Sequence, residues 1–252
     1  MQVIEFSEQN KKNNIYYSKR TIIKIIQSAL LLAIALILNW VSSNYFHLPF
    51  LNFLKFDFSL ISLVIIALYV NKKFVLIVAF IFILIAPSFS AKGYEISNFF
   101  GYLVLITLQL IFNFVFSSIY SPYQKNKIKF YLKANLLKYQ VSTLNCIKKP
   151  KTNRLLIGKL FITVVLSSLI ITILNVLITT PVYFWLYKIS PDSSFITLAQ
   201  NWKNYQAIFL NIPNYYLATI LIYFTFNLLN LSLNSILIYI LITINTKNKF
   251  IR

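Results

Sequence analysis

The apolar residues of this chain come in long runs separated by short polar segments that are rich in lysine. Three of these runs cover residues 21–43, 98–120 and 156–187. They are apolar around the whole helix rather than along one stripe, which is typical of helices that face lipid or the inside of a helical bundle. Each run contains the roughly 20 residues that a helix needs to cross a bilayer. The pattern therefore predicts membrane-spanning helices over these three ranges.

Two shorter apolar runs, 58–70 and 74–86, flank the sequence Asn-Lys-Lys at 71–73. One continuous helix would hold both lysines near the bilayer centre, at a cost of about 5–7 kcal/mol. Two short helices that turn at 71–73 would place both ammonium groups at a membrane surface. We therefore expect a helical hairpin, whose second helix ends before Pro87.

Prolines divide the last two apolar runs. We expect the helix at 156–187 to be interrupted near Pro181, because proline lacks a backbone donor and disfavours helix in the residue before it. The final run, 207–244, is broken at 211–214, and we expect its helix to begin at Pro213, since proline is tolerated in a first turn. With the hairpin, the sequence predicts an all-α integral membrane protein with six transmembrane helices.

The basic residues orient this arrangement. Of the 24 Lys and Arg residues, four fall in segments that would lie outside if the N-terminus is inside, and these are Lys55, Lys92, Lys188 and Lys203. The positive-inside rule therefore predicts that both termini are cytoplasmic. We expect a basic cytoplasmic tail at 1–20, a membrane domain at 21–244 with a basic cytoplasmic loop at 121–155, and a cytoplasmic tail at 245–252. The loop is too short and too polar to form a core of its own.

The composition argues against several classes of protein. One Cys, one His and three Gly leave no material for a metal site, a disulfide framework or a phosphate-binding loop. The five carboxylates are too scattered for the clusters that membrane enzymes use, so we expect no catalysis and no cofactor. The net charge is +19, and the basic residues lie in the segments between the apolar runs. This pattern predicts contact with membrane lipid and not with nucleic acid.

Aromatic residues gather in the segments that this topology places outside, among them Tyr183, Trp185, Trp202, Tyr215 and Tyr216. Such flat walls with polar groups favour a site for a planar organic ligand. The alternative is an aromatic belt at the membrane interface. A belt should occur at both faces, whereas these residues are more numerous on one, which favours the binding site.

Several polar residues lie within or beside the apolar runs. Asn175 needs a partner from a neighbouring helix or from a ligand, since an unpartnered buried amide is costly. Lys55 and Asp57 precede an apolar run and suit an interfacial anchor and a helix cap as well as a ligand site. Gln109 and Asn113, one helical turn apart, are interpreted as interhelical hydrogen bonds.

A polar residue near the start of one apolar run and a pair of small residues in another allow less specific interpretations. Asn98 is a candidate cap for its helix. Ala29 and Ala33 lie one turn apart, where small side chains allow a second helix to approach closely. That second helix could belong to this chain or to another subunit.

Four segments resemble the substrate-binding S components of energy-coupling factor (ECF) vitamin transporters, especially the riboflavin-binding members. They are FLKFDFSLIS at Phe53–Ser62, LNVLITTPVYFWLY at Leu174–Tyr187, NIPNYYLA at Asn211–Ala218, and the pair Ala29 and Ala33. The sequence departs from the family pattern in two of them. An Asp and a Pro of the first motif are Leu60 and Ser62 here. A ligand-contacting Asn and Lys of the riboflavin type fall on Tyr215 and Ala218, with Asn214 one position away.

The resemblance implies a multi-pass protein of the cell membrane that captures a vitamin from outside and delivers it by reorienting in the membrane. It implies a transmembrane coupling subunit and two ATPase subunits as partners, which use the ATP. The expected ligand contacts are Asn175, Tyr183, Asn214, Tyr215, Lys55 and Asp57, and the expected docking residues for the coupling subunit are Ala29 and Ala33. Riboflavin is the leading candidate ligand. The alternatives are another vitamin or precursor, or a membrane scaffold subunit without a transport role.

Overall fold

The computed structural model describes residues 2–48, 51–140 and 152–248. Within these ranges the chain is largely helical, with one antiparallel pair of short strands. In chain order, the labelled elements are α1 (Gln2–Tyr45), β1 (His47–Leu48), β2 (Leu51–Lys55), α2 (Leu60–Ile65), α3 (Lys72–Ile85), α4 (Ile96–Gln140), α5 (Thr152–Leu174), α6 (Thr180–Leu186), α7 (Phe195–Gln200) and α8 (Tyr215–Asn248). Wider π-helical turns continue α2 at Ile66–Val70 and join α5 to α6 at Asn175–Thr179. Short 3₁₀ turns cover Ala86–Phe89, Trp202–Asn204 and Gln206–Phe209.

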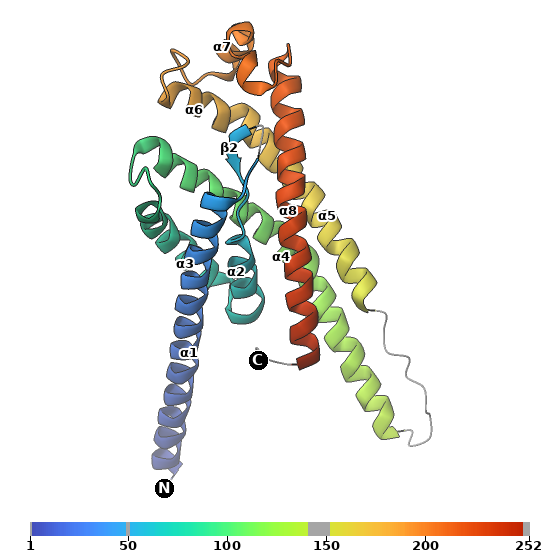
Figure 1. The fold of residues 1–252 in the computed structure, drawn as a ribbon. Coiled ribbons are helices and arrows are strands. Elements are labelled where there is room, and N and C mark those ends of the chain that lie inside the picture. Colours follow the sequence, from blue (N-terminus) through green and yellow to red (C-terminus); the bar gives the residue numbers. More distant parts are fainter. Residues whose placement is uncertain (1, 49–50, 141–151, 249–252) are drawn as a thin grey trace.

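The helices form an elongated bundle, in which α4, α5 and α8 pack along one another and α1 lies against α2 and α3 (Figure 1). The first residues of α1 and the end of α8 point toward the same side of the molecule. The helices α6 and α7 lie at the opposite side, which we call the α7 end. The described ends of the chain, at the start of α1 and the end of α8, therefore lie on one side of the molecule.

The helical hairpin predicted at 71–73 is confirmed. Asn71 has an extended backbone and ends the α2 segment, and its side chain accepts a hydrogen bond of 3.0 Å from the backbone N–H of Lys73. This is a normal N-cap, which begins α3. Lys72 and Lys73 are both exposed at the turn. The lysines are therefore kept out of the packed interior, for the energetic reason given above.

Among the residues that the structure describes, five helical segments are long and apolar enough to cross a membrane: Thr21–Tyr45, Lys72–Phe89, Ile96–Tyr120, Leu155–Leu186 and Tyr215–Asn245. The segment predicted to be a sixth span, Leu60–Val70, is also apolar but shorter. A helix of that length covers about half of the roughly 30 Å hydrocarbon core. In the connection before it, Leu51, Leu54 and Asp57 are buried, so this part of the chain packs against the helices.

Several boundaries differ from those predicted. Residues 2–20 of the expected tail and 121–140 of the expected loop are helical, because α1 and α4 continue beyond their apolar segments. The expected outer loop contains the β1–β2 pair, in which Leu48 lies opposite Leu51. The polar loop before the last helix contains α7. The final helix begins at Tyr215, two residues after Pro213, because Asn214 caps it.

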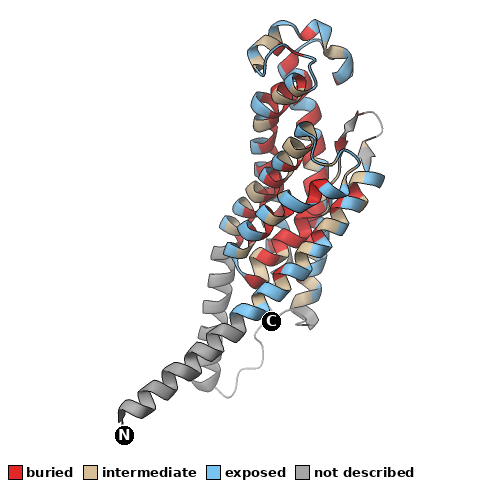
Figure 2. Cartoon of the chain, turned by 90° about the vertical axis from the view of Figure 1, so that its left-hand side faces the viewer, coloured by how far each residue is buried: buried red, intermediate tan, exposed pale blue. Residues whose placement is uncertain are grey.

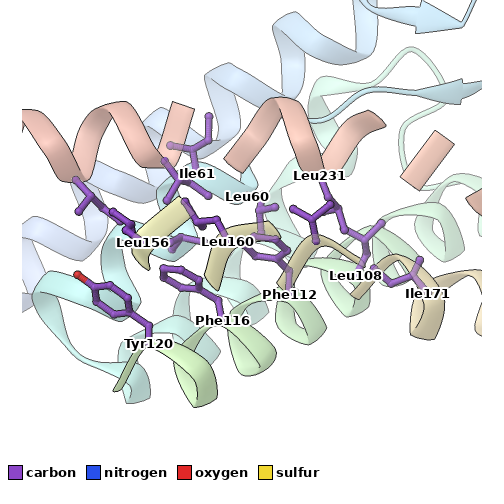
Figure 3. Packing of buried hydrophobic residues seen from close by; sticks show 14 residues of the cluster. Leu60, Ile61, Leu108, Phe112, Phe116, Tyr120, Leu156, Leu160, Ile171 and Leu231 are labelled. Carbon is purple, nitrogen blue, oxygen red and sulfur yellow. The ribbon is translucent and has the colours of Figure 1, made fainter. Parts of the chain in front are cut away.

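The apolar core fills the inside of the bundle, while the outward faces carry large exposed hydrophobic side chains suited to lipid (Figure 2). The main cluster lies between α2, α4, α5 and α8 (Figure 3). Phe112, Phe116 and Tyr120 stack along successive turns of α4, with ring centroids 6.2 and 5.1 Å apart. A second cluster, which includes Trp202, Phe209 and Tyr215, packs α7 and the 3₁₀ turns onto α8. This second cluster closes the α7 end.

Candidate ligand-binding site

A cavity of about 1000 Å³ lies among the helices. Its walls come from α1, β2, the connection between α3 and α4, the first turns of α4, the π-helical turn and α6, and the middle of α8. The lining combines amide side chains with aromatic rings, namely Asn39, Asn44, Asn98, Asn175, Asn227, Asn230, Phe89, Tyr102, Tyr183, Phe184, Tyr187, Phe209, Tyr223 and Phe226. Its volume is at the upper end of the range for sites that enclose a small organic molecule.

Asp57 is the centre of a buried hydrogen-bond network on one wall of this cavity. Its side chain is 5% exposed. The carboxylate accepts hydrogen bonds from Asn39 Nδ2 at 3.0 Å, Ser59 Oγ at 2.6 Å and Gln109 Nε2 at 2.7 Å. These bonds satisfy the carboxylate without a cation, as a buried charge requires.

The backbone of Asp57 extends the network to α8. Its N–H donates to Asn230 Oδ1 at 3.2 Å, and its carbonyl accepts from Asn234 Nδ2 at 2.8 Å. The network therefore joins α1, the connection between β2 and α2, α4 and α8. Asp57 Oδ1 also accepts from the backbone N–H of Ser59 at 3.4 Å, a bond of the kind that the cap interpretation expected, although Ser59 itself occupies the N-cap position of α2.

Lys55, two residues earlier on β2, behaves differently. It is exposed and lines the cavity. Lys92 also lines the cavity from the connection before α4. Its Nζ lies 3.3 Å from the hydroxyl of Tyr187 and 5.2 Å from the centre of that ring. Two lysines thus stand at the exposed part of the cavity, which we call the mouth.

The predicted interruption of the fifth helix is a π-helical turn just before Pro181. Within it, the N–H of Thr180 donates to the carbonyl of Asn175, five residues earlier. The next carbonyl, that of Val176, would need the N–H of residue 181, which proline lacks. The hydroxyl of Tyr215 donates to it at 2.5 Å instead. Proline thus widens the helix beside the cavity, and α8 supplies the missing donor.

The widened turn places Asn175 in the cavity wall, with 7% of its surface exposed. About two turns further, Tyr183 lies against α4. A Cβ on Gly101 of α4 would lie 2.7 Å from the Tyr183 hydroxyl, so glycine gives this ring its space. Tyr183 also stacks on Tyr187, with centroids 6.0 Å apart. Together these rings form an aromatic wall that begins beside Asn175 and ends at the mouth.

Four of the six predicted ligand contacts line the cavity: Lys55, Asp57, Asn175 and Tyr183. Asn214 and Tyr215 do not. Asn214 accepts from the N–H of Leu217 at the start of α8. Tyr215 is 2% exposed and packs in the second cluster.

The sequence analysis missed Asn39, Asn227 and Asn230 as cavity residues. Asn227 and Asn230 are three residues apart on α8, within an otherwise apolar run, and this spacing was the available signal. The signal is weak because asparagine is common throughout this chain, so two asparagines at this spacing carry little information. Asn39 gave no such signal, since its partner Asp57 is 18 residues away.

Two further predictions concern α4. Gln109 makes the interhelical hydrogen bonds predicted for it, whereas Asn113 Nδ2 donates to the carbonyl of Gln109 in its own helix. Asn98 is not a helix cap. It lies in the first turn of α4, and its side chain donates back to the carbonyl of Gly93 and to Ser90 Oγ. It thereby fixes the connection that carries Lys92.

Ala29 and Ala33 lie on an exposed face of α1, beside exposed residues such as Ile22, Ile26 and Ile37. They do not mediate close packing with another helix of this chain. Their small side chains therefore leave a shallow surface that faces away from the bundle.

The groups that line the cavity are suited to binding. Among the residues that the structure describes, no group of three or more His, Cys, Asp or Glu side chains could hold a metal ion. The Asp57 carboxylate already has four hydrogen-bond donors, three from side chains and one from the backbone N–H of Ser59. The remaining cavity groups are amides, hydroxyls, aromatic rings and two lysines, which orient a ligand without reacting with it.

Residues 23–242 match the family described as ECF transporter, substrate-specific component. The chain belongs to this family. As an S component, it is a substrate-binding subunit of an ECF transporter and a membrane-embedded protein, and its family is one of transporter subunits rather than enzymes. S components in general work with an energy-coupling module that contains a membrane coupling subunit and ATPases. No curated protein and no solved structure matches the chain.

Proposed function

We propose that this S component captures a vitamin from outside the cell, with riboflavin as the first candidate, and delivers it across the cell membrane. The cavity of about 1000 Å³ carries the proposal. It is large enough for a multi-ring molecule, and its amides and stacked tyrosines suit a flat ligand with polar edges.

The proposal includes six spans with both termini in the cytoplasm, an arrangement that would open the cavity to the outside. In that orientation the α7 end and the mouth lysines face outward, and the turn at Lys72 and Lys73 faces inward. The positive-inside rule supports this orientation, because the described lysines are more numerous on the inward side.

The ligand test is a spectrum. The protein is purified in detergent, and its absorption is recorded before and after addition of riboflavin. We expect a bound flavin chromophore and a rise in melting temperature, because a ligand that binds only the folded state stabilises it. A colourless preparation whose melting temperature ignores excess riboflavin contradicts riboflavin as the ligand.

A second candidate is the same transport role with a different vitamin or precursor. The observation that favours it is the position of Asn214 and Tyr215, which do not line the cavity. These residues fall at or next to the positions where the riboflavin type places its helix 6 contacts. The same melting assay, run with a panel of vitamins, separates the two candidates.

We further propose that transport needs a coupling subunit and two ATPase subunits, which supply the ATP hydrolysis. The exposed face of α1 around Ala29 and Ala33 is the docking surface in this proposal. Small side chains there would let a helix of the coupling subunit approach closely.

A further inference from the structure

The wall of the cavity formed by Asn39, Asp57 and Asn230, which we call the inner wall, has a fixed hydrogen-bonding polarity. Asn39 Nδ2 donates to the Asp57 carboxylate, and a carboxylate can only accept. The amide therefore cannot rotate by 180°, and Asn39 Oδ1 stays an acceptor. Asn230 Oδ1 accepts from the backbone N–H of Asp57, which can only donate. Asn230 Nδ2 therefore stays a donor.

The inner wall also carries a negative charge. The three residues are 7%, 5% and 3% exposed, in the order Asn39, Asp57 and Asn230. All side-chain partners of the carboxylate are neutral groups, namely Asn39, Ser59 and Gln109. A charge held in so little contact with water acts strongly on its surroundings. The inner wall thus repels an acidic group and favours one that donates hydrogen bonds.

The mouth has the opposite polarity. Lys55 and Lys92 are exposed, line the same cavity and carry only donors. Lys92 is held in place by Tyr187, which its Nζ approaches to 3.3 Å. Lys55 and Asp57 lie two residues apart, so one short segment places a positive group at the mouth and a negative group at the inner wall.

We propose that Asp57 is a positioning residue that polarises the cavity, so that a ligand binds with a neutral, hydroxyl- or N–H-bearing end against Asn39 and Asn230 and any acidic group beside Lys55 and Lys92. A hydroxyl suits the inner wall because it can donate to Asn39 Oδ1 and accept from Asn230 Nδ2. The inference rests on the proposed function only in taking this cavity as the substrate site. It holds for any vitamin, not for riboflavin alone.

The test uses pairs of small molecules that differ only by an acidic group at one end: riboflavin with riboflavin 5′-phosphate, and pantothenol with pantothenate. Affinities are measured on the full chain in detergent for the unaltered protein and its variants. Asp57→Asn removes the charge and frees the Asn39 amide to rotate. We expect it to weaken both members of a bound pair by the same factor, about tenfold, which corresponds to one buried hydrogen bond. Lys55→Gln should weaken only the acidic member.

A ligand bound in the opposite direction gives a different pattern. Its acidic group would lie against Asp57, so Asp57→Asn would tighten the acidic member relative to the neutral one, and this result overturns the inference. A variant that does not fold is replaced by Asn39→Ala, which keeps the charge of Asp57 and removes the acceptor. It should weaken both members about tenfold, and unchanged affinity overturns the inference as well.

Two exposed residues outside the cavity lining provide matched controls. Glu95→Gln removes one negative charge and Lys203→Gln one positive charge, and neither should change any affinity. The pairs also separate this inference from the proposed ligand. If only the pantothenol pair binds and shows the expected pattern, riboflavin is refuted while the polarity stands. If riboflavin binds and Asp57→Asn favours its phosphate, the polarity is refuted while the ligand stands.

Discussion

At the scale of single residues, the structure gives roles to side chains that look alike in the sequence. Tyr215 and Tyr216 are neighbours, yet Tyr215 is 2% exposed and bonds the carbonyl that Pro181 leaves free, while Tyr216 is exposed. Gly101 and Gly158 both lie within helices, yet only Gly101 meets another side chain closely. In each pair, substitution of the second residue is a control for substitution of the first.

Tyr215→Phe should lower the free energy of unfolding by about 1–3 kcal/mol, because it leaves the buried carbonyl of Val176 without a donor. Tyr216→Phe should change it by less than about 0.5 kcal/mol, as is usual at an exposed position. Thermal unfolding in detergent measures both variants. Equal stabilities would mean that the hydroxyl of Tyr215 does not support the π-helical turn.

Gly101→Ala should weaken ligand binding about tenfold, since the new Cβ would lie 2.7 Å from the Tyr183 hydroxyl and must displace that ring from the cavity wall. Gly158→Ala meets nothing within 4 Å, and in a helix it should stabilise the protein by about 0.5–1 kcal/mol. Titration of ligand into both variants tests the contrast. Unaltered affinity in Gly101→Ala would show that the position of Tyr183 is unimportant.

The residue scale is also where prediction from the sequence reached its limit. The burial of Asp57 depends on donors 18 and 52 residues away, and no local pattern connects Asp57 with Asn39 or Gln109. The position of Asn175 needed only its own helix, because an amide in an apolar run must find a partner. That argument left a neighbouring helix and a ligand as alternative partners, and the family resemblance favoured the ligand. Whether it contacts a ligand stays a prediction.

At the scale of elements, helix boundaries could be predicted where polar residues or a proline mark the end of a helix. The turn at 71–73 followed from the cost of burying two lysines, and the break near Pro181 followed from its missing donor. The start of α1 and the end of α4 could not be found in the same way, because both helices continue into polar sequence. The helix α1 contains no proline or glycine, and α4 continues through Pro122. The short β1–β2 pair could not be predicted for a different reason, since a strand of two residues is too short to show an alternation of polar and apolar residues.

Asn71→Ala should destabilise the hairpin by about 1 kcal/mol, because the N–H of Lys73 loses its cap. Asn71→Ser retains an oxygen that can accept the same hydrogen bond and should cost much less. Thermal unfolding of the two variants, compared with the unaltered chain, checks the prediction. A Ser variant as unstable as the Ala variant would show that the side chain of Asn71 acts through something other than the cap.

At the scale of the whole molecule, the cavity and the proposed docking face are separate. The face of α1 at Ala29 and Ala33 points away from the bundle, and neither alanine lines the cavity. Binding and delivery can therefore be disturbed independently. The helix α1 still joins the two regions, since it carries Asn39 ten residues after Ala29.

Ala29→Trp and Ala33→Trp should each abolish uptake by cells that contain the complete transporter, because an indole at either position prevents close approach of a partner helix. Ligand affinity of the purified variants should stay within about twofold of the original. Ile173→Trp, at an exposed position on α5, is the control and should retain uptake. Uptake that survives both alanine substitutions would exclude this face as the docking surface.

The π-helical turn at Asn175–Thr179 also affects how this chain is compared with its relatives. One extra residue in a turn rotates everything beyond it by about 100° around the helix axis. Tyr183 therefore points in the direction that residue 182 would have in an unbroken helix, and Tyr187 in the direction of residue 186. A relative without this turn superposes on the outer half of the helix only after a one-residue alignment gap, so the roles of residues beyond Thr179 must be transferred by position in space and not by count along the sequence.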